Sequence, residues 1–263
     1  MKARLPWPAT MLAALGIALL GLPFLGLVWR APWGSLFDVL GRESVRQALW
    51  LSLRTSLAAT AVAIVLGLPL AWLLATIDFP GRSLVRALCT LSMVLPPVVG
   101  GVALFSAFGR RGLIGQWLDR WLDVRLPFTT WGVILAQSFV AMPFLVITVE
   151  AALRQLDERY EQAARTLGAS RAYAFRRVTL PAIRPALIAG AVLAWARALG
   201  EFGATITFAG NLPGRTQTMP LVTYLALDVD PPEALIMSLI LVAVSFAVLV
   251  GLRDRWLSGI RGG

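Results

Sequence analysis

The sequence predicts an all-α polytopic membrane protein, a helix bundle that crosses the bilayer six times. Hydrophobic residues make up 58% of the chain and charged residues only 14%, with a mean hydropathy of +0.75. Soluble proteins average about 45–50% apolar and about 25% charged residues. Five stretches without any charged residue are each long enough for a transmembrane helix, which takes about 20 residues. A sixth stretch is interrupted by one arginine and one glutamate and is otherwise as hydrophobic as the rest.

The six expected spans follow one another within a single domain, residues 1–263. The first lies behind Lys2 and Arg4 and is longer than the apolar core of a signal peptide, so we expect it to stay as a signal anchor. In chain order, the expected spans are residues 8–29, 48–77, 87–108, 128–150, 185–208 and 234–252.

Arginines and lysines orient these spans. With the N-terminus in the cytoplasm, the inner segments hold 14 basic residues and the outer segments hold 8. Basic residues in short loops favour the cytoplasmic side, so we expect both termini there. The net charge of +10 therefore describes a membrane topology. Nucleic-acid binding would need arginines clustered on a soluble face and is excluded.

Several kinds of chemistry are excluded by the composition. The chain has no histidine, which removes the commonest metal ligand and general base. Lys2 is its only lysine, so no lysine-dependent phosphate loop can form. Cys89 is the single cysteine, and we expect it to be a small buried residue. The sequence therefore predicts a non-catalytic protein that binds no metal.

A proline pair interrupts the third expected span. Pro96 and Pro97 lack backbone N–H donors, so the helix should break or kink near the middle of the membrane. Such a break is tolerated at that depth where the freed carbonyls face protein or water. Gly100 and Gly101 follow at once and allow close helix approach. The segment either lines a translocation path or gate, or is a structural kink.

The fifth expected span carries two charges. Arg197 and Glu201 are four residues apart, so they share one face of a helix. An unpaired charge near the centre of a membrane helix costs about 2.5–3.5 kcal/mol, so both should face the bundle interior. Gly203 and Thr205 beside them offer small or hydroxyl-bearing surfaces. The pair either attracts a passing anion or is a structural ion pair.

The loop 151–184 is expected to form a helix–turn–helix in the cytoplasm. Apolar residues recur at helical spacing from Leu153 to Leu167, which predicts an amphipathic helix. Gly168 suits the left-handed position that ends such a helix, and Ser170 is the expected N-cap of the next one. We expect Leu180-Pro181 to end that second helix, because proline disfavours helical backbone in the residue before it. The apolar stripe needs a partner or lies on the bundle or lipid surface.

A short interfacial helix is expected on the outer side. Residues 113–122 alternate tryptophans and leucines with polar residues at helical spacing. This helix either anchors the loop at the membrane surface or contacts an external protein.

Three parts of the cytoplasmic loop resemble the EAA loop of permease subunits of ATP-binding-cassette (ABC) importers. They are Gln162-Ala163-Ala164, then Gly168, then residues 178–181 (VTLP), and their spacing matches the family pattern throughout. Gln162 stands where the family has glutamate and lacks its charge, while Glu161 beside it offers a substitute carboxylate. Residues 95–101, 108–112, 196–205 and 209–211 resemble the molybdate and sulfate branch of these permeases, and the combination is closest to molybdate permease subunits.

The resemblance implies a type I ABC importer permease fold in a single permease domain of the cell inner membrane. It implies a homodimer served by two ATPase subunits, which hold ATP and Mg²⁺, and by a periplasmic or extracellular oxyanion-binding protein. This chain itself would bind no cofactor. The ATPase-coupling residues implied are Glu161, Gln162, Ala163, Ala164, Gly168, Leu180 and Pro181. The path or gate residues implied are Pro96, Pro97, Gly100, Gly101, Arg197, Glu201, Gly203 and Thr205.

The expected substrate is molybdate, and two alternatives stay open. Sulfate or tungstate transport fits the same motifs, because selection among tetrahedral oxyanions resides mainly in the binding protein. An ion-coupled secondary carrier would need no ATPase, but such carriers usually show two repeated halves and relays of buried ionisable residues.

Overall fold

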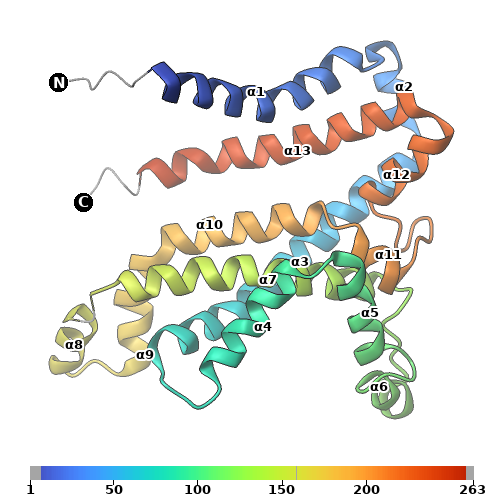
Figure 1. Cartoon of the computed structure of the whole chain (residues 1–263). Coiled ribbons are helices and arrows are strands. Elements are labelled where there is room, and N and C mark those ends of the chain that lie inside the picture. The colour runs from blue at the N-terminus through green and yellow to red at the C-terminus, as the bar shows by residue number, and fades with distance from the viewer. Residues whose placement is uncertain (1–6, 158, 259–263) are drawn as a thin grey trace.

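The computed structural model describes residues 7–157 and 159–258, apart from the side chains of Glu161 and of residues 252–258. All secondary structure in these residues is helical, which confirms the all-α class (Figure 1). The elements are α1 (Trp7–Arg30), η1 (Trp33–Ser35), α2 (Leu36–Gly41), α3 (Glu43–Thr76), α4 (Arg82–Val94), α5 (Pro97–Phe108), α6 (Gly115–Leu122), α7 (Thr130–Gln155), α8 (Arg159–Thr166), α9 (Arg171–Ala174), η2 (Phe175–Thr179), α10 (Leu180–Leu199), α11 (Gly203–Ala209), α12 (Met219–Val229) and α13 (Pro231–Ser258).

Five helices in the described residues are long and apolar enough to cross a membrane. They are Trp7–Arg30, Glu43–Thr76, Thr130–Gln155, Arg171–Leu199 and Pro231–Gly251. Each overlaps one expected span. The expected third span, 87–108, is instead divided between α4 and α5, and neither helix alone has the length of a crossing. The expected fifth span, 185–208, differs as well, because its helix begins at Arg171 and ends at Leu199.

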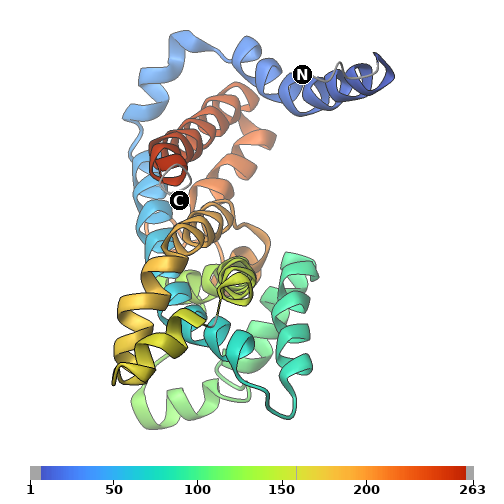
Figure 2. The ribbon, with the colours of Figure 1, turned by 90° about the vertical axis from the view of Figure 1, so that its left-hand side faces the viewer.

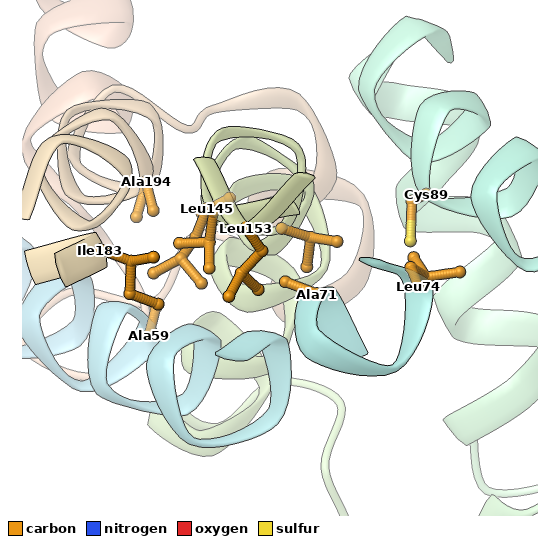
Figure 3. Close-up of a cluster of buried hydrophobic side chains, with 12 residues drawn as sticks. Ala59, Ala71, Leu74, Cys89, Leu145, Leu153, Ile183 and Ala194 are labelled. Carbon is orange, nitrogen blue, oxygen red and sulfur yellow. The ribbon is translucent and has the colours of Figure 1, made fainter. Parts of the chain in front are cut away.

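The centre of the bundle is α7, which packs against both α3 and α10. A Cβ atom added at Gly67 of α3 would lie 3.0 Å from a methyl carbon of Leu145 on α7, and one at Gly190 of α10 would lie 3.2 Å from the Leu145 Cα. Figure 3 shows Leu145 in this cluster, with Ala59 and Ala194 on the facing helices. Because lipid gives helices no hydrophobic reason to associate, such close packing holds them together.

Two breaks interrupt the helices of the bundle, one between α4 and α5 and one between α10 and α11. The break predicted from the proline pair is present: α4 ends at Val94, Pro96 is the N-cap residue of α5, and Pro97 is its first residue. A second break separates α10 from α11, with Gly200, Glu201 and Phe202 between them. The sequence analysis placed these residues inside a continuous span.

The loop 151–184 differs from the expected helix–turn–helix in two ways. First, α7 continues to Gln155, so Leu153 is a buried residue of the long helix and not part of the short amphipathic one. Second, Leu180-Pro181 does not end a helix. A π-helical turn precedes it, in which the N–H of Leu180 donates to the carbonyl of Phe175. This wider turn carries the helix through Pro181, which has no N–H to donate.

A second hydrophobic core joins helices from the N-terminal and C-terminal parts of the sequence. α12 and α13 pack on α2 and α3 around Val45, Met219 and Met237, each of which is at most 1% exposed. In contrast, α1 contains no buried residue in the described chain, and Figure 2 shows it extending away from the bundle. Much of its apolar surface is therefore free to contact lipid or another protein.

The short helix predicted around residues 113–122 is present as α6. Trp117 and Trp121 are exposed on it, as tryptophans at headgroup depth would be. Asp119 accepts hydrogen bonds from Arg125 (2.7 Å) and Arg110 (2.8 Å), which tie both flanks of the helix together. These hydrogen bonds, the one from Arg125 foremost, lower the pKa of the Asp119 carboxyl. The tie is therefore fully charged at neutral pH and weakens only as the pH falls through that lowered pKa.

Candidate functional site

The two broken helices pack on each other through glycines. A Cβ atom added at Gly203, the first residue of α11, would lie 2.8 Å from the Cβ of Pro97, the first residue of α5. One added at Gly101 would lie only 2.6 Å from the Cβ of Thr207. Real Cβ atoms do not approach so closely, so only glycine fits at these two positions without a shift. The structure thus brings both candidate path segments into one junction.

Arg197 and Glu201 lie beside this junction and pair with each other. Arg197 Nη1 is 2.6 Å from Glu201 Oε2, and the two form an ion pair whose geometry is not that of a hydrogen bond. Glu201 Oε1 accepts a hydrogen bond of 2.8 Å from the backbone N–H of Ala204. This N–H belongs to the first turn of α11, where a negative charge is favoured by the helix dipole. Glu201 therefore links the end of α10 to the start of α11.

Burial raises the energetic cost of losing either member of this ion pair. The Glu201 side chain is 0% exposed, whereas that of Arg197 is 27% exposed. A carboxylate taken out of water needs a partner, and removing one member of a buried pair costs about 3–5 kcal/mol. Of the two alternatives that the sequence left open, this geometry agrees with an ion pair, and Glu201 faces the interior as expected.

Two buried polar side chains near the junction lack hydrogen-bond partners. Gln137 of α7 is fully buried, and neither its Oε1 nor its Nε2 is hydrogen-bonded within the described residues. The hydroxyl of Thr205, on α11, is likewise unpaired there. Because buried polar groups are normally satisfied, such groups point to water or to a second arrangement of the helices. Sequence reasoning missed Gln137, although a glutamine within a charge-free span was a usable signal.

The remaining path candidates surround the same contact. Gly100 is buried, and a Cβ added there would lie 3.3 Å from a ring carbon of Phe139 on α7. Pro96 and Pro97 are exposed in the single chain. The face of α5 away from α11 is also open, since Val98, Val99 and Val102 are each about half exposed.

The coupling candidates gather on and around α8. Gln162 and Ala163 are exposed, Ala164 is half-buried, and the side chain of Glu161 lies outside the described residues. Gly168 follows α8 with a φ of +90°, in the left-handed region that favours glycine, as predicted.

The helix beyond Gly168 starts as expected. Ser170 accepts a hydrogen bond of 3.2 Å from the N–H of Tyr173, which confirms it as the N-cap. Leu180 and Pro181 lie about two turns further on, at the start of α10, and so are apart from the exposed surface of α8.

A cluster of arginines braces the bundle next to α8. Arg82 donates two hydrogen bonds to the carbonyl of Leu74 near the end of α3, at 2.7 and 2.9 Å, and Arg86 and Arg154 donate to the same oxygen at 3.4 and 3.3 Å. Glu150 accepts from Arg86 at 2.6 Å and from Arg154 at 3.0 Å. Cations are favoured at a helix C-terminus, and the shared carboxylate ties α4 to α7.

Sequence reasoning missed this arginine cluster. The spacing of Glu150 and Arg154 at the end of a charge-free stretch was its only local sign. Within the described residues, no group of three His, Cys, Asp or Glu side chains is placed to hold a metal ion.

The two neighbouring glycines of α5 give a matched test of the helix junction. We expect Gly101→Ala to destabilise the protein by about 1–3 kcal/mol, because the new methyl group meets Thr207 and the backbone of Ala204. Gly100→Ala should cost less, since only the edge of the Phe139 ring must give way. Thermal unfolding in detergent measures the stability of both variants. An equal loss of stability in the two would contradict the packing described.

Comparisons with known proteins place the chain in a family. The model of the family described as "Binding-protein-dependent transport system inner membrane component" matches residues 63–259. The molybdenum transport system permease protein ModB of Mycobacterium tuberculosis is 43% identical over 243 residues, which cover 92% of each chain. ModB of Escherichia coli K12 is 41% identical over 81% of this chain and 93% of its own. The sulfate transport system permease protein CysT of Salmonella typhimurium is 39% identical over 82% of this chain and 78% of its own.

Solved structures show the same fold. A bacterial ABC transporter that imports alginate contains a chain with a TM-score of 0.71 and 17% identity, covering 95% of this chain and 94% of that one. The inward-facing methionine transporter MetNI gives a TM-score of 0.64 at 17% identity, over 81% of this chain and 95% of that one. The chain belongs to the family of binding-protein-dependent transport system inner membrane components, as a multi-pass, non-catalytic permease subunit of an ABC importer.

Proposed function

We propose that the importer carries molybdate and that this chain forms half of its translocation path. The observation that carries the proposal is the 43% identity to a molybdenum permease over 92% of both chains. Sulfate is the second candidate, because a sulfate permease is 39% identical over 82% of this chain. Tungstate, a tetrahedral oxyanion like molybdate, is an alternative of the same kind. An external oxyanion-binding protein delivers the anion.

In this proposal a second copy of the chain closes the path along the exposed face of α5. Val98, Val99 and Val102 are open there, while the opposite face of the helix is closed by α11 through Gly101. The contact between α5 and α11 would then act as a gate, with Arg197 drawing the anion and Glu201 holding Arg197 in place. The unburied apolar surface of α1 is further area for contact with the second copy.

Two ATPase subunits, each holding ATP and Mg²⁺, dock on the loops around α8. Tyr160 and Leu167 support this role, since they are 64% and 89% exposed at the edge of a polar helix. Exposed apolar side chains at both ends of a short polar helix suit contact with a protein partner. ATP binding closes the ATPase dimer, and α8 passes that motion to the bundle. The excess of basic residues in the loops around α8 supports a cytoplasmic position for α8 and both termini, with α4 and α5 together forming a sixth crossing.

The substrate is tested by uptake into proteoliposomes that contain the permease, the ATPase and the binding protein. We expect ATP-dependent molybdate uptake that tungstate inhibits well and sulfate only weakly, because the three oxyanions carry the same charge and differ in size, and sulfate is the smallest. Vesicles without the ATPase serve as the control. Preferred uptake of sulfate would assign the chain to the second candidate, and uptake without the ATPase would contradict an ABC importer.

Coupling is tested with two glycines that share one backbone conformation. Gly168 and Gly81 both have a φ of +90°, and both have open space around an added Cβ. Leucine at either position therefore brings a similar backbone strain, of order 1–3 kcal/mol. We expect Gly168→Leu, or deletion of residues 158–168, to reduce uptake at least tenfold without preventing membrane insertion. Gly81→Leu should keep most of it. Normal uptake by the Gly168→Leu variant would contradict the assigned role.

A further inference from the structure

A cavity lies on the side of the bundle, between α3 and the helix that follows the α8 loop. Its volume is about 290 Å³, and it is lined by Leu68, Pro69, Trp72, Arg171, Ala172 and Phe175. Trp72 and Phe175 contact each other edge to face, with ring centroids 6.1 Å apart. The walls are apolar except at Arg171, so the cavity suits a molecule with an apolar body and one anionic group.

The position of this cavity matches the boundary between lipid chains and headgroups. Trp72 lies one turn before the end of α3 at Thr76, and tryptophan is favoured at that depth of a membrane. Arg171 is the first residue of its helix, after the N-cap Ser170. Leu68 and Pro69 lie deeper along α3, on the side of the chains. The apolar walls thus lie at the depth of the acyl chains, and the arginine lies at the depth of the phosphate.

The sequence that contains Arg171 is rich in positive charge. Residues 162–200 contain six arginines and no aspartate or glutamate. Arg171 is exposed, and it forms no ion pair with any described residue. Arg177 contacts the ring of Tyr173, with its guanidinium carbon 6.0 Å from the ring centroid. Arg171 is thus free to take an anion.

We propose that this cavity binds an anionic phospholipid of the leaflet next to α8. One acyl chain contacts Leu68, Pro69 and Trp72, and the phosphate pairs with Arg171. The lipid then touches both α3 and the segment that follows α8, and it holds the two together. The inference goes beyond the proposed transport function and depends on it only for the name of the leaflet, which is the cytoplasmic one.

Native mass spectrometry of the purified full-length permease measures the binding directly. The probes are phosphatidylglycerol and phosphatidylcholine with identical acyl chains. We expect the wild type to retain phosphatidylglycerol at least fivefold better, since an arginine near anionic lipid gains about 1 kcal/mol, which corresponds to about fivefold. Inorganic phosphate should not displace the lipid, because it makes none of the apolar contacts.

Three variants locate the site. Arg171→Gln should abolish the preference for phosphatidylglycerol, and Ala172→Phe, which fills the cavity, should reduce retention of both lipids. Arg176→Gln removes an equal charge five residues after Arg171, at an exposed position outside the cavity lining, and should keep the preference. If Arg171→Gln and Arg176→Gln lose the preference for phosphatidylglycerol to the same extent, the proposal is overturned, because the preference would then come from the overall positive charge of the surface.

Two other outcomes would also overturn the lipid site. They are equal retention of the two lipids by the wild type, and unchanged retention in Ala172→Phe, which would place the lipid elsewhere or show the cavity covered by another polypeptide. None of these results depends on which oxyanion is carried, so they are distinguishable from a failure of the proposed function.

Discussion

The carboxylate of Glu201 is enclosed by the bundle, and its two oxygens face different helices. Oε2 lies 2.6 Å from Arg197 on α10, and Oε1 accepts the N–H of Ala204 on α11. A buried charge is tolerated only with such partners. This requirement fixes the turn between α10 and α11, and that turn sets the position of Gly203 against Pro97. The contact between the two broken helices therefore depends on one ion pair and one helix cap.

The same helix connects this ion pair to the coupling loop. Arg171–Leu199 is continuous through a π-helical turn and bends there (Figure 1), and it measures about 43 Å along its axis at a rise of about 1.5 Å per residue. One end follows Gly168 and α8, and the other carries Arg197. This continuous segment gives a displacement at α8 a route to the α5–α11 contact. The arginines around Leu74 hold the neighbouring ends of α3, α4 and α7 to one another.

Features set by a residue and its immediate neighbours were predictable from the sequence, and features that depend on contacts between helices were not. The break at Pro96, the positive φ of Gly168 and the Ser170 cap each follow from a residue and its immediate neighbours. The passage of the helix through Pro181 was mispredicted, because a π-helical turn absorbs the missing donor. The break after Leu199 was missed because it depends on Glu201 capping the next helix, a contact that spacing alone does not reveal.

A double-mutant cycle at Arg197 and Glu201, followed by unfolding in detergent, tests most directly whether a buried ion pair holds the broken-helix junction. Arg197→Gln leaves a buried carboxylate without its cation and should destabilise the protein by about 3–5 kcal/mol. Adding Glu201→Gln removes the stranded charge and keeps an oxygen for the Ala204 N–H, so the double variant should be more stable than Arg197→Gln alone. A double variant that is equally or less stable would contradict the account.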